Sequence, residues 1–476
     1  MKQIFLLSSV LLLAGFGQAG QNQAPAGFTA LFNGQDLSGW YGWGTSDPSA
    51  LWAMTPEQLA DYKQKSVAGG LVDNKGKPQT DHIAAHWKAV DGELVNDGKG
   101  LYLTTDKDYG DFELCLEYKA LPDGDSGVYL RGVPQVQIWD STKGDPRGLG
   151  QDKGSGGLWN NSKGAPGKDP SKRMDKPFGE WNRFQITMIG ERVTVVFNGE
   201  TVVDHAVLEN YFANKKAGYV AFAKPGPAGK APPPEKLPNG FMRDPVLPKG
   251  PIQLQTHGSE IRWRNIFIRE IPAEEANAVL GARDDTGFVR IDNGRDLSNW
   301  QGAVTNYEVK DGCIVCQPHK GGDLLTQEEY GDMILRFEFK LPPAGNNGIA
   351  LRTPLGGHSA SDGLEIQVLD SDGYNAAHPK APLLPYQYHG SLYHCVGAKH
   401  GFLRPVGQWN YEEIEVRGQT IKVTLNGTKI LDVDIDKLDR TQIAHPPKGL
   451  DRTSGFIGFA GHSDPVAFRN FRVKRL

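Results

Sequence analysis

This chain of 476 residues has no large excess of positive or negative charge. It also has few cysteines and few long apolar runs. Its 52 Lys and Arg against 56 Asp and Glu give a net charge of −4, which leaves no broad basic surface for a phosphate backbone and excludes nucleic acid as an expected partner. Four cysteines are too few for a scaffold held by disulfides. The sequence also lacks the fingerprints of P-loop, dinucleotide-binding, serine-hydrolase and zinc-protease sites.

One apolar run is present, at residues 4–14, between Lys2 and a stretch rich in Gly and Ala. It is shorter than the ~20 residues that span a bilayer. A positive start, an apolar middle and a small-residue end are typical of a secretory signal peptide. We therefore predict a signal peptide at 1–20, no transmembrane segment, and a periplasmic or secreted mature protein.

The rest of the chain repeats itself, with the same motifs in the same order. An Asp-Leu-Ser-x-Trp motif ends at Trp40 and again at Trp300, and residues 136–141 return as 366–371. We therefore predict two copies of one domain, at 26–272 and 286–476. A linker with a short helix, at 273–285, joins them.

Short alternating runs separated by turn residues dominate both copies. Asn198-Gly199 and Asn426-Gly427 each stand between two such runs, which is typical of a type I′ β-hairpin. Many short strands of this kind predict an all-β sandwich or jelly roll in each copy. One helix is expected in an insert of the first copy, at 55–64, where Thr-Pro-Glu provides a helix start.

The motifs taken together resemble the 3-keto-disaccharide hydrolase domain family, formerly a domain of unknown function. They are the Asn-Gly-x-Asp-Leu-Ser-x-Trp opening, an Asp-Gly hairpin, Leu-Arg, Gln-x-x-Asp-Ser and Gly-x-Trp-Asn, each present twice. The resemblance covers nearly the whole mature chain. It implies two tandem concanavalin/laminin-G-like jelly-roll β-sandwiches, bacterial export, and cleavage of glycosides whose sugar was first oxidised at C3.

The strongest candidate for chemistry is the stretch 363–371. Residues two apart in a strand share a face, so Glu365 and Gln367 point one way while Ile366 and Val368 enter the core. Asp370 falls at the strand end, where its direction stays open. An ordinary solvated face is the alternative to a ligand-facing one.

The first copy has Gln135 in place of Glu365. A neutral amide cannot move a proton as a carboxylate can, and the adjoining Pro134 disfavours an inner strand. We therefore expect the second copy to be active and the first to bind sugar at most, through Gln137 and Asp140.

Charged residues at strand ends are further candidates. Arg131 and Arg352 close matching strands and offer planar donor forks, for sugar oxygens or to hold Glu365 ionised. His257 and His462 precede the last strand of each copy and suit acid–base work near neutral pH. A purely structural role is the alternative for all four.

Aromatic residues and histidines gather in the second copy. Rings of this kind stack on sugar faces, although core packing explains them equally well. Trp159 is the apparent first-copy counterpart of Tyr393. The members of the cluster are Tyr386, Tyr388, His389, Tyr393 and His394.

Metal binding stays open. A divalent ion such as calcium is compatible with the fold class, but no ligands can be named, and the spacing of three histidines fits no zinc signature. The cysteines at 313 and 316 are expected as buried thiols, or with one disulfide to Cys395. The three histidines are His389, His394 and His400.

The resemblance implies a mechanism that needs one base, because a C3 ketone acidifies the C2 hydrogen and allows elimination followed by hydration. We expect Glu365 or His462 as the base, Arg352 or a metal to steady the enolate, and Tyr393 or His389 to protonate the leaving oxygen. Two alternatives are a non-catalytic, lectin-like protein that binds oligosaccharide and an adhesion module of the cell envelope.

Overall fold

The computed structural model describes residues 21–73, 75–146, 148–213 and 244–476. The predicted signal peptide lies outside these residues. No helix within them is long and apolar enough to cross a membrane. Two compact units are formed, the first from the chain up to 213 together with 246–271, the second from 272–476.

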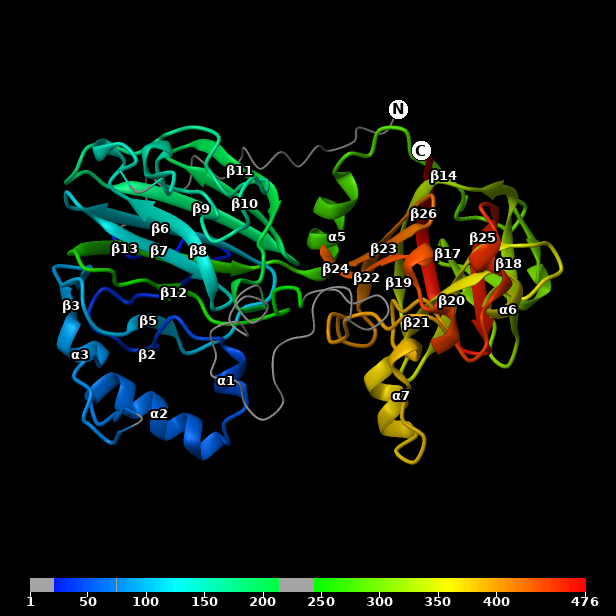
Figure 1. Ribbon diagram of the computed structural model, residues 1–476, viewed down its shortest axis with the longest axis horizontal. Helices are drawn as coiled ribbons and strands as arrows, with labels where there is room; N and C mark the ends of the chain where they lie inside the picture. The colour runs from blue at the N-terminus through cyan, green and yellow to red at the C-terminus, as the bar shows by residue number, and fades with distance from the viewer. Residues whose placement is uncertain (1–20, 74, 147, 214–243) are drawn as a thin grey trace. The chain divides into compact units, whose positions relative to one another are not determined.

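The first unit is a sandwich of two antiparallel sheets (Figure 1). The eight-stranded sheet runs in the order β11 (Glu200–Val207), β10 (Arg192–Phe197), β9 (Asn182–Ile189), β6 (Phe112–Ala120), β13 (Ile261–Glu270), β4 (Glu93–Asn96) and β3 (Trp87–Val90), with β1 (Thr29–Ala30) beside β13. The five-stranded sheet runs in the order β2 (Trp40–Trp43), β5 (Tyr102–Thr105), β12 (Gln253–Leu254), β7 (Asp125–Leu130) and β8 (Val133–Trp139).

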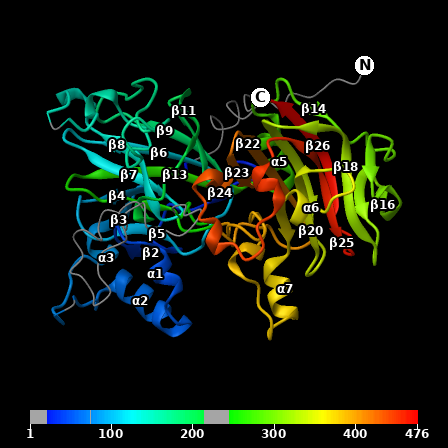
Figure 2. The same ribbon diagram turned by 45° about the vertical axis from the view of Figure 1, so that its right-hand side comes forward.

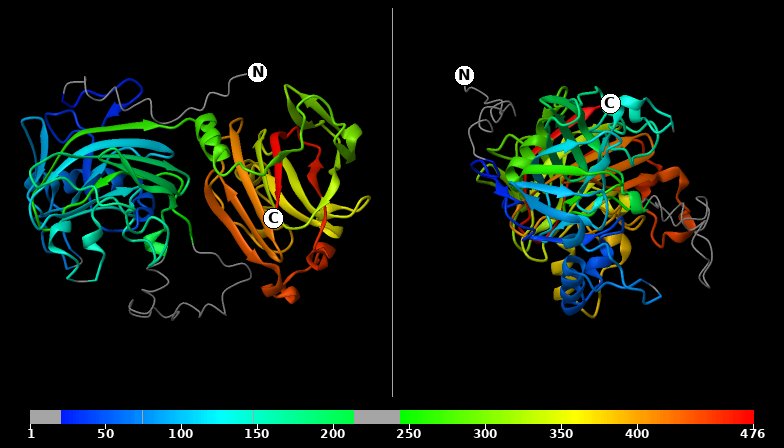
Figure 3. Two further views of the ribbon diagram at one scale, coloured as in Figure 1. Left: turned by 90° about the horizontal axis from the view of Figure 1, so that it is seen from above. Right: turned by 90° about the vertical axis from the view of Figure 1, so that its left-hand side faces the viewer.

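The second unit repeats this topology strand for strand, and its layers can be followed in Figures 2 and 3. Its eight-stranded sheet runs in the order β24 (Thr428–Asp434), β23 (Thr420–Leu425), β22 (Trp409–Arg417), β19 (Met333–Lys340), β26 (Ala467–Arg475), β17 (Cys313–Cys316) and β16 (Tyr307–Lys310), with β14 (Val289–Arg290) beside β26. The five-stranded sheet runs in the order β15 (Trp300–Gly302), β18 (Gly321–Tyr330), β25 (Gly455–His462), β20 (Asn346–Thr353) and β21 (Leu364–Leu369). The prediction of two tandem jelly-roll β-sandwiches is confirmed.

Local sequence explains the hairpins. Asn198 and Gly199 have φ of 49° and 91°, and Asn426 and Gly427 have φ of 50° and 83°. Two successive positive φ values define the type I′ turn, which matches the twist of the strands that it joins. Each unit then buries its own cluster of Leu, Ile, Val and Phe between its two sheets.

The helix expected in the first-copy insert is α2 (Pro56–Ala68), which continues four residues beyond the predicted end and lies against β2 (Figure 1). Thr55 caps it, and Gln58 completes a reciprocal capping box. The other insert helices are short: α1 (Ser49–Trp52), α3 (Ile83–His86), α6 (Ser359–Asp362) and α7 (Ser371–Ala377).

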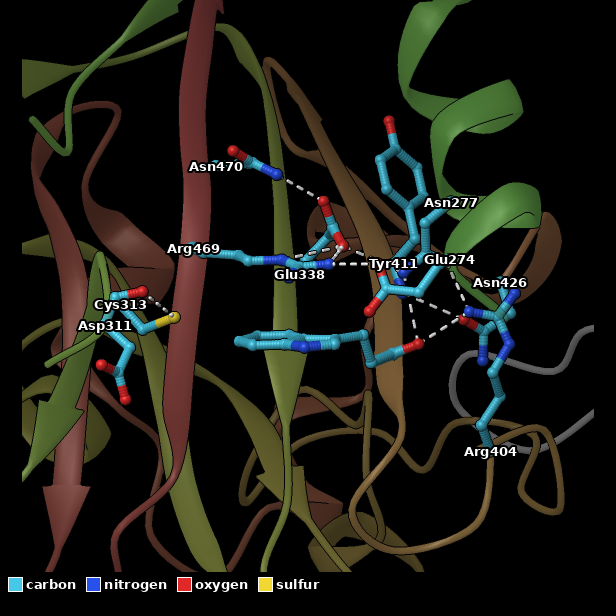
Figure 4. Close-up of polar contacts among 11 residues, drawn as sticks. Glu274, Asn277, Asp311, Cys313, Glu338, Arg404, Tyr411, Asn426, Arg469 and Asn470 are labelled. Carbon is cyan, nitrogen blue, oxygen red and sulfur yellow. Dashed lines mark hydrogen bonds and ion pairs between the residues drawn. The ribbon is translucent and has the colours of Figure 1, made fainter. Parts of the chain in front are cut away.

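The predicted linker helix is α5 (Ala273–Ala282), and it packs against β22 of the second unit (Figure 4). Asn277 donates from Nδ2 to Glu338 Oε2 at 3.1 Å and to the Trp409 carbonyl at 3.2 Å. Arg469 bonds Glu274 and Glu338, each at 2.6 Å, and its guanidinium lies 3.9 Å from the Trp409 ring centre. The helix is thus anchored on the second sandwich.

All four cysteines are free thiols, so the alternative of a disulfide to Cys395 is wrong. Cys115 and Cys316 are buried, whereas Cys313 and Cys395 are partly exposed. Burial raises the pKa of the Cys395 thiol to about 12, so that it stays protonated at neutral pH.

Candidate functional site

Glu365 lies on β21 with its side chain on the face opposite the core. Ile366 and Val368 are fully buried in the core cluster, as the alternation predicts. Glu365 itself is only 2% exposed, yet neither carboxylate oxygen makes a standard hydrogen bond to a described residue. Its neighbour Gln367 is satisfied, because Nε2 donates to Asn346 Oδ1 at 2.7 Å. A buried carboxylate without such bonds is costly for the fold and points to a role in binding or catalysis.

A glycine on the next strand makes room for this carboxylate. In the pairing of β20 with β21, Gly348 stands opposite Gln367 and Ala350 opposite Glu365. A Cβ on Gly348 would lie 2.1 Å from Glu365 Oε1. Glu365 therefore lies across the backbone of Gly348, a position that any larger residue would close.

His462, at the end of β25, is the partner of Glu365. Its Nε2 lies 3.5 Å from Glu365 Oε1. Hydrogen bonding to Glu365 raises the pKa of His462, against the opposing effect of burial, and Asp323 and Asp464 add to the rise. His462 therefore keeps its proton to a higher pH than an ordinary histidine. The stabilisation from this pairing is complete below the ordinary histidine pKa and is lost as the pH rises through the raised value.

Replacing Glu365 by Gln should lower the pKa of His462, because the amide removes both the charge and its strongest acceptor. The change can be followed as the imidazole chemical shifts in an NMR titration of the wild type and the variant. An unchanged midpoint would show that the two side chains do not interact.

Asp323 on β18 joins this group and was missed by sequence reasoning. Its carboxylate accepts hydrogen bonds from Ser359 N at 2.8 Å and Ser359 Oγ at 3.1 Å. Burial raises the pKa of Asp323, and the charge of Glu365 acts in the same direction. No sequence signal marks this residue, since only the pairing of β18 with β25 brings it near His462.

Tyr393 and His394 follow β21 closely. The Tyr393 backbone N–H donates to the Glu365 carbonyl at 2.9 Å. The His394 ring lies 4.3 Å from the ring of Tyr393 and 5.7 Å from that of Tyr386. Burial and the neighbouring His445 lower the pKa of His394, while Glu365 opposes the shift. His394 is thus poised to be neutral where His462 is charged.

His389 is not at this site. Its Nε2 lies 2.9 Å from Glu412 Oε2, and the two side chains are 4% and 0% exposed. Its ring centre is 5.0 Å from that of Phe339 in the core. The expectation that His389 protonates a leaving group is corrected, because its ring is enclosed in the sandwich, where Nδ1 accepts from Leu369 N at 3.4 Å and Nε2 contacts Glu412. Strand alternation could have revealed Glu412, which shares an inward face with Ile414.

The two arginines are structural. Arg352 donates from Nη1 to Gln419 Oε1 at 2.8 Å and from Nη2 to the Gly418 carbonyl at 2.5 Å. Arg131 pairs with Asp111 at 3.0 Å and is 1% exposed. Each guanidinium fixes a neighbouring loop, so Arg352 does not hold Glu365 ionised as the sequence suggested.

Asp370 and Asp140 are capping residues. Asp370 accepts hydrogen bonds from Gly373 N at 3.1 Å and Ala344 N at 2.8 Å, at the start of α7. Asp140 accepts one from Thr142 N at 2.8 Å. Their carboxylates are therefore engaged by backbone, which corrects the expectation that they bind sugar.

On the corresponding face of the first unit, the neutral Gln135 occupies the position of Glu365. Gln135 donates to Gln137, whose own Nε2 donates to Asp125 Oδ1 at 2.9 Å. His257 lies 3.0 Å from Asp125 and is half exposed. An imidazole and a carboxylate meet here as well, but the carboxylate comes from β7 and not from the position of Glu365.

Large side chains also occupy the first unit's face. Tyr129 stands opposite Gln253, whereas the second unit pairs Ala350 with Gly458 at the same place. The ring of Tyr102 adds to this, with its centre 5.4 Å from that of Tyr129. The second unit has only small residues where these large side chains stand and keeps the carboxylate of Glu365, so it carries the candidate active site.

The side chain of Trp159 contacts residues other than Gln135 and Gln137. Its indole donates to the Leu149 carbonyl at 3.0 Å, and its ring meets Trp139 edge to face at 5.9 Å. The tryptophan belongs with the β8 end of the first unit.

The three candidate metal ligands do not converge. His389 is paired with Glu412, and His400 stacks on Tyr388 with 4.8 Å between ring centres. Across the described ranges, no group of three or more His, Cys, Asp or Glu side chains has the arrangement of a metal site. The calcium or other divalent ion left open by the sequence thus gains no ligand set.

The chain is similar to several known proteins. A 3-keto-disaccharide hydrolase of Bacteroides thetaiotaomicron is 26% identical over 252 residues, which are 44% of this chain and 86% of the relative. A Parabacteroides distasonis structure provisionally described as a glycosyl hydrolase is 24% identical, covers 40% of this chain and 95% of its own, and has a TM-score of 0.36. A carbohydrate-binding module of Bacillus subtilis is 15% identical over 40% of this chain and 96% of its own, with a TM-score of 0.23.

The family model described as a 3-keto-alpha-glucoside-1,2-lyase-like domain matches twice, over residues 27–269 and 287–474. The two matches fall on the two sandwich units and together span most of the chain. The chain therefore belongs to the 3-keto-alpha-glucoside-1,2-lyase-like domain family of carbohydrate-active, hydrolase-like proteins.

Proposed function

We propose that the second unit hydrolyses glycosidic bonds of 3-keto sugars by elimination and hydration. The observation that carries the proposal is the buried Glu365 carboxylate, which lacks standard hydrogen bonds to described residues and lies 3.5 Å from His462. The family match and the named relative support the substrate class. The apolar run at 4–14 supports action after export, in the periplasm or outside the cell.

Glu365 is proposed as the base that removes the C2 hydrogen. A general base needs a free lone pair and a site that limits water, and Glu365 offers both. The C3 ketone makes this hydrogen acidic enough for a carboxylate. The electron pair of the C2–H bond then forms an enolate with its charge on the C3 oxygen.

His462 is proposed to steady this enolate. Its raised pKa favours the imidazolium form, which places a positive charge and an N–H donor beside the base. Preorganised charge of this kind is worth most where negative charge develops in a site with little water. The role replaces the one that the sequence suggested for Arg352.

Elimination breaks the C1–O bond, and Tyr393 is proposed to protonate the oxygen that leaves. His394, whose lowered pKa favours the neutral ring, takes a proton from the water that adds to C1 of the enone. Protonated Glu365 returns its hydrogen to C2. A proton then passes from protonated His394 to the tyrosinate of Tyr393, whose ring centre lies 4.3 Å away, so that both groups return to their starting states. The sum of these steps is hydrolysis, with no oxidant or reductant consumed.

The test is to incubate the mature protein with 3-keto-trehalose and, separately, with unoxidised trehalose. We expect glucose and 3-keto-glucose from the first and no product from the second. Chelator is added in a parallel arm to reveal any need for a divalent ion. Binding of both disaccharides with release of neither product would instead favour the lectin-like alternative, which rests on the neutral, Gln-lined face of the first unit.

A further inference from the structure

The first unit holds a cavity of about 400 Å³ at one end of its sandwich. It lies where β6 ends at Ala120, β8 ends at Trp139 and β9 begins at Asn182. The segment 173–178 forms another part of its wall. A volume of this size suits a single sugar residue and is typical of small-molecule sites.

Aromatic side chains form the apolar part of the wall. Trp139 lines the cavity, and its indole N–H is already engaged by the Gly154 carbonyl at 2.9 Å. Phe178 lines it from the 173–178 segment and is 38% exposed. Rings whose polar edges are satisfied present apolar surface, on which the C–H face of a sugar can pack.

The polar groups of the wall are unevenly satisfied. Lys176 donates from Nζ to the Trp181 carbonyl at 3.0 Å, and Asp175 accepts from Ser155 N at 3.1 Å. Arg173 has no hydrogen bond or ion pair to any residue in the described ranges. Among these groups, the guanidinium at the cavity is the one left to bind an anion, and its planar fork matches a carboxylate.

Deeper in the wall, the Tyr118 hydroxyl is buried and makes no hydrogen bond of standard geometry to a described residue. Burial raises the pKa of this hydroxyl well above its usual value, so that it stays a neutral donor. A contact with the Ser155 side chain moderates this rise, so the hydroxyl has a polar neighbour within the wall.

The cavity is a feature of the first unit. At the positions of Trp139 and Tyr118 the second unit has Leu369 and Phe339, which carry neither an indole nor a hydroxyl. The indole and the hydroxyl of this cavity are thus found in the first unit. At the Glu365 site it is the second unit that holds the reactive group.

We propose that this cavity is a non-catalytic binding site for a sugar residue that bears a carboxylate. The ring packs against Trp139 and Phe178, the carboxylate pairs with Arg173, and a hydroxyl accepts from Tyr118. The site is independent of Glu365 and does not rest on the proposed catalytic function.

The test uses the mature full-length chain and isothermal titration calorimetry with methyl glucuronide and methyl glucoside. We expect the glucuronide to bind about two- to fivefold more tightly, since a charge pair with an exposed guanidinium contributes up to about 1 kcal/mol. Arg173→Gln should remove this preference, and Trp139→Leu, the second unit's residue, should weaken both sugars. Circular dichroism checks that each variant is folded.

Two controls keep the result specific. Arg295→Gln removes an exposed arginine of the second unit and should leave binding unchanged. Glu365→Gln should also leave it unchanged, so that loss of turnover and loss of this site are distinguished. Equal affinity for the two sugars, no heat from either, binding insensitive to Arg173→Gln, or loss of binding in Glu365→Gln would each overturn the proposal.

Discussion

Glu365→Gln is expected to lower the turnover of 3-keto-trehalose by about 10²- to 10⁴-fold, the range that general-base catalysis supplies. The variant keeps the shape of the side chain and removes the lone pair that takes the C2 hydrogen. The substitution also reproduces the residue that the first unit carries, Gln135. The measurement is the initial rate of glucose release at saturating substrate.

The stability of this variant should fall modestly near neutral pH, because the pairing of Glu365 with protonated His462 is lost. The loss is partly offset, because a buried carboxylate is itself costly to the folded state. Gln135→Ala is the matched control in the first unit and should not affect turnover. Full activity of Glu365→Gln would remove Glu365 from the mechanism.

His389→Ala is expected to destabilise the second unit by about 1–3 kcal/mol, because it leaves the buried Glu412 carboxyl without its hydrogen-bond partner. Glu412 is fully buried, and His389 Nε2 at 2.9 Å is that partner. The measurement is urea unfolding, followed through the transition that belongs to the second unit. A loss below about 1 kcal/mol would show that the contact between His389 and Glu412 contributes little to the stability of the second unit.

The first unit indicates which residues should restore the stability that is lost in His389→Ala. At the corresponding positions it has Ser155, whose Oγ accepts from Trp139 N at 3.2 Å, and Phe184 in the core. The double variant His389→Ser with Glu412→Phe replaces the contact between His389 and Glu412 by that combination. It should recover most of the lost stability, since exchanging a buried pair for packed apolar volume is often neutral or better.

The two units show how one topology carries two surfaces. The strand order and the hairpin turns are the same in both. The differences lie on one face of the five-stranded sheet, where the second unit has the small Ala350 and Gly458 and the first has the larger Tyr129 and Gln253. A sandwich tolerates such exchanges because residues on this face do not contribute to the core between the sheets.

Much of the fold was predictable from the sequence because local rules set it. Alternation along 112–118 and 333–340 identifies strands, Asn-Gly pairs identify hairpins, and a capping box identifies the start of α2. The repeat then gave the domain count, since matching motifs in the same order require matching folds. Glu365 and His462 were also named as alternative candidates for the base, from residue type and family resemblance.

The sequence by itself determined the two β-sandwiches, their turns, and the neutral residue at the first copy's key position. Only the tertiary structure decided that Arg352 holds a loop, that His389 pairs with Glu412 inside the core, and that Asp323 joins the candidate site. The physical reason is distance along the chain. Backbone turns and alternation depend on neighbours, whereas these contacts depend on how strands far apart in sequence come into register.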